Sequence, residues 1–205
     1  GAQVVAAVEG LKESGTFSPL KHFPGHGDTL IDSHRALPTV SRNEKEVREI
    51  DLFPFAQGIN AGVDLVMTSH ICFEALDPKK PATFSSLILN NLLREELGFD
   101  GVVVSDSMNM HSLQKNYDSV DAAVEALCSG VDLIMLAEEH YDHDSQYQVR
   151  QRRLIEAVQK AFLDGKIPEN RIVDAISRVR QLKGKIKKVE NPRFEDSTWV
   201  SSSRE

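Results

Sequence analysis

Cysteine is nearly absent from this sequence, with only Cys72 and Cys128 among 205 residues. The two lie far apart and lack the short spacing of metal-binding pairs, so we expect two free thiols and no disulfide framework. They leave the redox compartment undecided. Long hydrophobic runs are missing too, since no stretch approaches the roughly 20 apolar residues of a transmembrane helix.

Basic residues are not in excess either. Lys and Arg number 24 against 31 Asp and Glu, a net charge of -7, which argues against nucleic acid or an anionic membrane as the main partner. The N-terminus lacks the basic region and apolar core of a signal peptide. It also lacks a starting Met and opens inside a predicted helix, so we expect a fragment of a longer polypeptide. The compartment, bacterial cytoplasm or secreted, is left open.

A glycine-rich phosphate loop is absent as well. The segment Gly25-His26-Gly27 lacks the third glycine and the helix start of a dinucleotide-binding loop. We therefore expect no nucleotide cofactor, and no other cofactor is indicated.

What the sequence does contain is an alternation of helical patterns with short apolar runs. The runs cover residues 17–22, 63–69, 101–106 and 131–137. Continuous apolar runs indicate strands buried on both faces, as in a parallel sheet. The segment AGVDLVM at 61–67 recurs as SGVDLIM at 129–135, each a helix end, a glycine and a strand. The repeat predicts βα units.

Four such units predict an α/β fold. A complete (β/α)8 barrel needs about 250 residues. We therefore predict a TIM-barrel type fold of which residues 1–188 form the C-terminal half, with a linker or frayed tail at 189–205. Helices are expected near residues 2–14, 43–62, 85–98, 119–129, 145–163 and 169–187. Asn43 is the predicted N-cap of the second helix, and Pro54 is expected to bend or restart it.

One loop concentrates titratable groups. Residues 21–34 include Lys21, His22, His26, Asp28, Asp32 and His34. Three interpretations compete: a metal site, an acid–base catalytic loop, or a polar turn without chemistry. The imidazoles and carboxylates could bind Zn²⁺, joined by His70. However, Pro24 and Gly25 separate His22 from His26 and exclude a helical i,i+4 pair of ligands.

The acid–base interpretation rests on a spacing and on a position. Asp32 and His34 are two residues apart, so an extended segment places their side chains on one side, where the carboxylate orients the imidazole. Asp106 follows an apolar strand, where a carboxylate can act as a nucleophile or a stabiliser of positive charge. In βα folds function collects at the C-terminal ends of the strands. That is where these residues fall: Lys21, His22, Ser69, His70, Ser105, Asp106 and Glu138.

These motifs resemble glycoside hydrolase family 3. The resemblance covers about residues 1–188 and rests on KHFPGHGDT at 21–29, DSH at 32–34, MTSH at 67–70 and GVVVSDSM at 101–108. The histidine loop is similar to that of the β-N-acetylglucosaminidase (β-hexosaminidase) branch. The β-glucosidase branch shares the Lys-His and Ser-Asp ends but lacks this loop.

The resemblance implies a role for each position. Asp106 would be the nucleophile, His34 the general acid and base, and Asp32 its partner. Lys21 and His22 would bind sugar hydroxyls. Beyond what the resemblance implies, His70 is expected either to bind substrate at the pocket wall or to make a structural hydrogen bond. The remaining loop residues would shape the turn without binding metal, namely Gly25, His26, Gly27 and Asp28.

The implied reaction is the retaining hydrolysis of terminal non-reducing β-N-acetylglucosamine from peptidoglycan fragments or chitooligosaccharides. Phosphate could replace water as the acceptor, because a neutral histidine repels an anion less than a carboxylate does. The family's earlier strands also contribute substrate contacts, so the first half of the barrel is an expected partner. Two alternatives stay open: a metal-dependent hydrolase that uses the His/Asp loop, and a non-catalytic sugar-binding fragment.

Overall fold

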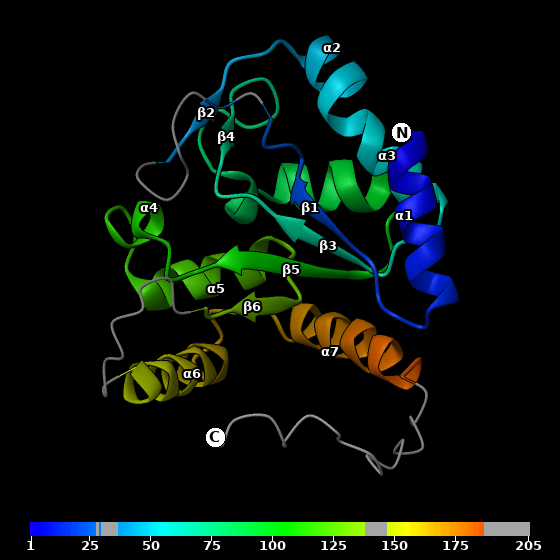
Figure 1. Ribbon diagram of the computed structural model, residues 1–205. Helices are drawn as coiled ribbons and strands as arrows, with labels where there is room; N and C mark the ends of the chain where they lie inside the picture. The colour runs from blue at the N-terminus through cyan, green and yellow to red at the C-terminus, as the bar shows by residue number, and fades with distance from the viewer. Residues whose placement is uncertain (28, 30–36, 138–146, 187–205) are drawn as a thin grey trace, which may run out of the picture.

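A four-stranded parallel sheet forms the centre of the molecule (Figure 1). The computed structural model describes residues 1–27, 29, 37–137 and 147–186. The strands run in the spatial order β1 (Pro19–Phe23), β3 (Leu65–Thr68), β5 (Val102–Ser107) and β6 (Leu133–Met135). Each strand therefore lies beside the strand of the preceding βα unit, which is the arrangement of successive strands in a barrel.

Helices connect and cover these strands. In chain order they are α1 (Ala2–Glu13), α2 (Glu44–Glu46), the π-helical η1 (Val47–Asp51), α3 (Leu52–Asn60), the π-helical η3 (Leu87–Glu96), α5 (Ser119–Ser129), α6 (Tyr147–Leu163) and α7 (Glu169–Gly184). No helix in the described ranges is long and apolar enough to cross a membrane. Cys72 is half-buried, Cys128 is exposed, and both thiols are free.

All four predicted strands are present, and each observed boundary lies within two residues of the predicted one. The repeated helix-to-strand joint is confirmed as well. Gly62 and Gly130 have φ angles of 81° and 128°, which an L side chain rarely adopts, and each ends a helix before a strand. The α/β prediction with four βα units is therefore confirmed.

The second helix begins as predicted but differs inside. Asn43 accepts a hydrogen bond from the Glu46 backbone N–H, and the Glu46 carboxylate accepts one from the Asn43 N–H, so the two residues form a capping box. Pro54 does not restart the helix. A π-helical turn at Val47–Asp51 precedes it, and α3 continues through Pro54 to Asn60.

Four short elements were not predicted. Strands β2 (Thr39–Val40) and β4 (Cys72–Phe73) pair in parallel beyond the ends of β1 and β3. The 3-10 turn η2 (Ala82–Phe84) and the short helix α4 (His111–Gln114) lie in segments predicted as loops. Elements of two to four residues are too short to produce a hydrophobic period in the sequence.

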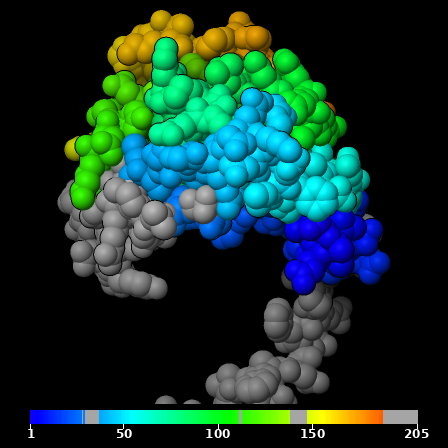
Figure 2. Space-filling view, turned by 90° about the horizontal axis from the view of Figure 1, so that it is seen from above, coloured from blue at the N-terminus to red at the C-terminus, as the bar shows by residue number. Residues whose placement is uncertain are grey.

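The two faces of the sheet differ. Val66 and Val103 are fully buried, and Phe23 at the end of β1 packs edge-on against Phe55 of α3 at 5.2 Å. The alternate residues of the strands are less covered, and Leu133 is 37% exposed. Figure 1 looks onto the strands in front of α5, and Figure 2 shows the molecule from above, with α1 (dark blue) projecting at one end. The sheet is thus covered on one face, as in part of a barrel.

Buried carboxylates tie the amino ends of the strands together. Asp64 accepts a hydrogen bond from the Ser18 N–H at 3.3 Å, and Asp132 accepts one from the Val103 N–H at 3.0 Å. Three arginines surround Asp132, at N–O distances of 2.7, 2.5 and 3.2 Å for Arg94, Arg171 and Arg178. Burial lowers the pKa of Arg94 to about 10, although Asp132 acts in the opposite direction.

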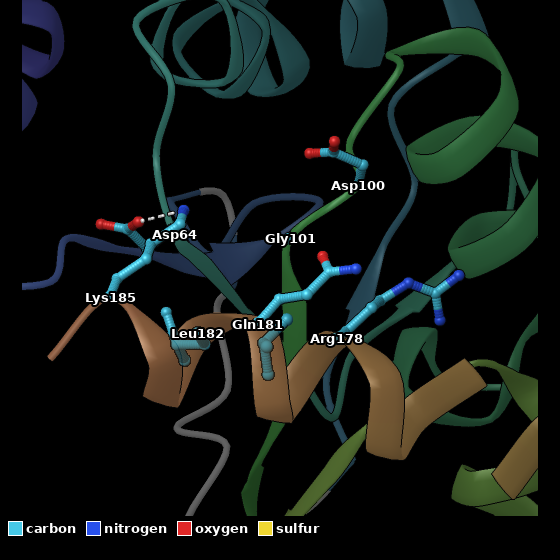
Figure 3. A pocket seen from close by; sticks show the side chains of 8 residues that line it. Asp64, Asp100, Gly101, Arg178, Gln181, Leu182 and Lys185 are labelled. Carbon is cyan, nitrogen blue, oxygen red and sulfur yellow. Dashed lines mark hydrogen bonds and ion pairs between the residues drawn. The ribbon is translucent and has the colours of Figure 1, made fainter. Parts of the chain in front are cut away.

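Helix α7 closes this amino end. Arg178, Gln181 and Lys185 extend from α7 toward the strand starts, and Lys185 Nζ lies 3.1 Å from Asp64 Oδ1 (Figure 3). The remaining cavity is about 80 Å³, too small for a sugar ring. The candidate site therefore lies at the other, carboxyl end of the strands.

Candidate active site

Two strands bring the predicted sugar-binding and nucleophilic residues together at the carboxyl end of the sheet. His22 comes from β1 and Asp106 from β5, with β3 between them. His22 Nε2 lies 3.4 Å from Asp106 Oδ2, and their side chains are 23% and 19% exposed. The second carboxylate oxygen of Asp106 accepts a hydrogen bond from the Ser107 N–H at 2.8 Å. Asp106 is thus held in place yet accessible.

A cavity of about 400 Å³ opens beside His22. Its lining combines cationic and polar groups with apolar ones: Lys21, His22, Gly25, His26, Gly27, Arg42, Ile50, Asp51, Pro54 and Phe55. The rings of His22 and His26 are 5.5 Å apart. This volume and mixed lining are typical of small-molecule sites.

The first residues of the His/Asp loop, at Gly25, pack against an ion pair that the sequence did not reveal. Arg42 donates two hydrogen bonds to the buried Asp51, at 2.9 and 3.0 Å. A Cβ at position 25 would lie 3.0 Å from Asp51 Cβ, so glycine permits the close approach of the loop to this pair. No motif marks Arg42 or Asp51, because Asp51 falls within a helical pattern and Arg42 precedes its cap.

His70 lies inside the protein behind the site. It is 1% exposed, its Nδ1 lies 2.8 Å from Thr83 Oγ1, and its Nε2 lies 3.0 Å from the Ser107 carbonyl oxygen. Burial lowers the pKa of His70. The geometry supports the structural hydrogen bond among the two predicted alternatives, and contact with substrate stays a prediction. Thr83 and Ser107 were not singled out from the sequence.

Several predicted residues lie outside the described residues: Asp28, Asp32, His34 and Glu138. The acid–base pair therefore has no structural test here. Among the residues that the structure does describe, no group of three or more His, Cys, Asp or Glu side chains could hold a metal ion.

A parallel βα array with Lys21, His22 and Asp106 at its carboxyl end can be compared with known proteins. Residues 1–182 match the glycosyl hydrolase family 3 N-terminal domain. The chain belongs to this family. The match to the family domain extends over most of this chain. Related structures confirm the predicted barrel-type fold.

Three relatives illustrate the likeness. Beta-hexosaminidase A of Pseudoalteromonas piscicida is 34% identical over 89% of this chain and 32% of its own length. A family 3 beta-N-acetylglucosaminidase structure from Paenibacillus sp. is 42% identical, with a TM-score of 0.81 over 88% of this chain and 33% of its own. A zinc-bound structure of CbsA from Thermotoga neapolitana is 32% identical, with a TM-score of 0.80 over 89% and 39%. The family 3 chain thus spans about a third of the length of these relatives.

Proposed function

We propose that this chain carries the catalytic face of a retaining β-N-acetylglucosaminidase. Relatives at 34% and 42% identity are named a beta-hexosaminidase and a beta-N-acetylglucosaminidase, which supports the substrate class. The observation that carries the proposal is the approach of His22 to Asp106, 3.4 Å apart at the carboxyl ends of two strands. That edge is where catalytic residues of barrel enzymes lie.

In the first step a carboxylate oxygen of Asp106 attacks the anomeric carbon of a terminal β-linked N-acetylglucosamine. The bond from that carbon to the leaving oxygen breaks, and protonated His34 gives its proton to this oxygen. The product is a glycosyl ester on Asp106. Placement on a strand suits Asp106 to this role, since the Ser107 N–H fixes one carboxylate oxygen at 2.8 Å.

In the second step neutral His34 accepts a proton from water as the water oxygen attacks the anomeric carbon. The ester bond to Asp106 breaks, which restores the carboxylate, and two inversions give net retention. Asp32 holds the His34 ring and stabilises its charged form. Lys21 and His22 bind sugar hydroxyls, consistent with their position on the lining of the cavity of about 400 Å³.

The substrate class includes peptidoglycan fragments and chitooligosaccharides, which share the terminal sugar. The open face of the sheet leaves room for further barrel strands, and we include an N-terminal barrel half as the structural partner that completes the pocket. Water is the proposed acceptor. Sugar 1-phosphate formed in phosphate buffer at the expense of free sugar would instead establish phosphorolysis.

The test is turnover of a chromogenic N-acetylglucosaminide by the full-length protein that its gene encodes. Asp106→Ala removes the nucleophile and should lower kcat by at least about 1,000-fold. Enzymes typically accelerate their reactions by about 10⁶-fold or more, so covalent catalysis would account for part of that acceleration. His34→Ala should lower kcat about 100-fold or more, the usual contribution of acid–base catalysis. Asp100→Ala is the matched control, because exposed Asp100 precedes the amino end of the same strand. Its activity should equal that of the unsubstituted protein.

Each alternative gives a different result. Loss of activity with a chelator, restored by zinc, would favour the metal-dependent hydrolase. Binding of N-acetylglucosamine without any turnover would favour the sugar-binding fragment. Unchanged kcat in Asp106→Ala would reject the proposed nucleophile.

A further inference from the structure

A buried polar network lies directly behind Asp106. Thr68, Ser69, His70, Thr83 and Ser107 are all at most 3% exposed. Such groups are costly to bury unless they are hydrogen-bonded, and each of them has a partner. None of these side chains acts in the two steps of the proposed reaction. The inference that follows rests on the proposed function of Asp106.

The direction of each hydrogen bond in this network follows from its acceptors. The Ser107 carbonyl can only accept, so His70 Nε2 donates to it at 3.0 Å. Because burial lowers the pKa of His70, its ring is neutral near pH 7 and Nδ1 must accept. The Thr83 hydroxyl has one proton and two candidate acceptors, His70 Nδ1 at 2.8 Å and the Ser69 carbonyl oxygen at 3.0 Å. With Nδ1 as an acceptor this proton goes to His70, and the Thr68 hydroxyl then donates to Thr83 Oγ1 at 2.8 Å. This chain runs from the end of β3 to the end of β5.

Ser107 links this chain to the nucleophile. Its N–H donates to Asp106 Oδ1 at 2.8 Å, while its carbonyl accepts from His70 and its hydroxyl donates to the Ala137 carbonyl at 3.2 Å. The residue is thus held at three atoms. Any rotation of the Ser107 backbone would move the N–H that fixes the Asp106 carboxylate.

The same network reaches the first strand. Ser69 donates through both its hydroxyl and its backbone N–H to the Phe23 carbonyl, at 3.0 and 2.9 Å. Phe23 is the neighbour of His22, which lies 3.4 Å from Asp106. The buried segment Thr68–His70 therefore braces both strands that supply the site.

We propose that His70, oriented by Thr83, is a positioning residue for the nucleophile Asp106 and acts through the backbone of Ser107. In this proposal His70 acts on Asp106 rather than on the sugar, since its side chain is 1% exposed and both ring nitrogens are engaged. Its loss leaves Asp106 present but badly oriented for attack. An error of about 1 Å in the position of a reacting group can cost about 100-fold in rate.

The test separates orientation from folding. A fluorinated N-acetylglucosaminyl fluoride has a leaving group that needs no proton, so its reaction with the full-length protein reports attack by Asp106 alone. The labelling stoichiometry by intact mass measures the fraction of folded sites, and the rate constant per labelled site measures the nucleophile. For His70→Phe we expect the rate constant per site to fall at least about 10-fold, whatever the stoichiometry. His70→Gln, whose amide can still donate to the Ser107 carbonyl, should recover part of the loss.

A second pair of variants decides the matter if His70→Phe does not fold. Thr83→Val removes the hydroxyl that orients His70 while keeping the shape, and Thr83→Ser keeps the hydroxyl. Slower labelling per site in Thr83→Val but not in Thr83→Ser supports the inference. Equal rate constants in all variants and the unsubstituted protein overturn it. An unsubstituted protein that is never labelled would contradict the proposed function itself, and the inference would fall with it.

Discussion

Burial divides the polar side chains at the carboxyl end of the sheet into two groups. His22 and Asp106 are partly exposed and can meet a ligand, whereas His70, Thr83 and Ser107 are enclosed. The two groups are in contact through the Ser107 backbone, whose N–H binds Asp106. The residues proposed to touch substrate and the residues proposed to position them are therefore neighbours at the carboxyl end of the sheet.

The neutral state of His70 has a consequence for stability. Its folded-state pKa lies below the ordinary value of 6.5, because burial outweighs the hydrogen bond to Ser107 and the charge of Asp106, with His22 acting in the same direction as burial. As the pH falls through 6.5, the unfolded chain takes up a proton that the folded ring does not. The free energy of unfolding therefore decreases as the pH decreases below 6.5. This residue contributes up to about 1.4 kcal/mol per pH unit to the decrease.

Urea unfolding at pH 7.5, 6.5 and 5.5 checks this dependence. His70→Gln should be less stable at pH 7.5, yet lose less stability than the unsubstituted protein on going to pH 5.5. The other six histidines are shared by both proteins and cancel in the comparison. Parallel pH profiles for the two proteins would show that His70 is not kept neutral by burial.

At the scale of the elements, the amino ends of the strands depend on buried carboxylates. The Asp132 side chain is fully buried and pairs with Arg94, Arg171 and Arg178, which come from η3 and α7. It also accepts the Val103 N–H of the neighbouring strand. Asp64 repeats the backbone contact two βα units earlier, with Lys185 in place of the arginines. The repeated sequence GVD thus encodes a repeated joint between strands.

Asp132→Asn should lower the free energy of unfolding by about 3–5 kcal/mol, since it removes the fully buried counter-charge of three partly buried arginines. Asp164→Asn is the control, because Asp164 is 46% exposed and pairs with exposed Lys160 at the end of α6. Its effect should stay within about 1 kcal/mol. Denaturant unfolding of both variants measures the difference, and equal small effects would show that the arginine cluster does not stabilise the fold.

The sequence predicted the strands well because continuous apolar runs, such as Val102–Val104, are typical of the strands of parallel sheets. The glycine joints were visible because Gly62 and Gly130 occupy conformations that other residues avoid. The π-helical stretches and the short β2–β4 pair were not predictable, since they depend on tertiary pairing rather than on a local period. Asp106 was found from its place at a strand end, whereas Arg42, Asp51 and Thr83 carry no local signal.

At the scale of the whole molecule, the sheet has one covered face and one open face. Leu133 on the edge strand β6 is 37% exposed, whereas Val66 and Val103 on the other face are fully buried. Barrel interiors are filled by side chains from all their strands. Further strands that complete the proposed pocket would pair with the edge strands β1 and β6 and enclose the open face as the barrel interior.

The open face of the sheet predicts a difference in activity between this chain alone and a protein with further barrel strands. If further barrel strands complete the pocket, a full-length protein that includes them should hydrolyse a chromogenic N-acetylglucosaminide at least about 100-fold faster than the 205-residue chain, because they would add groups that position the sugar. The measurement is kcat/KM for the two proteins at equal concentrations of folded chain. Equal values would show that the described residues suffice for catalysis.

The central claim is that Asp106 forms the bond to the sugar. Peptide mapping by mass spectrometry, after the full-length protein has reacted with a fluorinated N-acetylglucosaminyl fluoride, tests it most directly. The account predicts one sugar per chain, on the peptide that contains Asp106, and at the Asp106 side chain. A sugar attached to any other residue, or turnover of the chromogenic substrate without a labelled peptide, would contradict it.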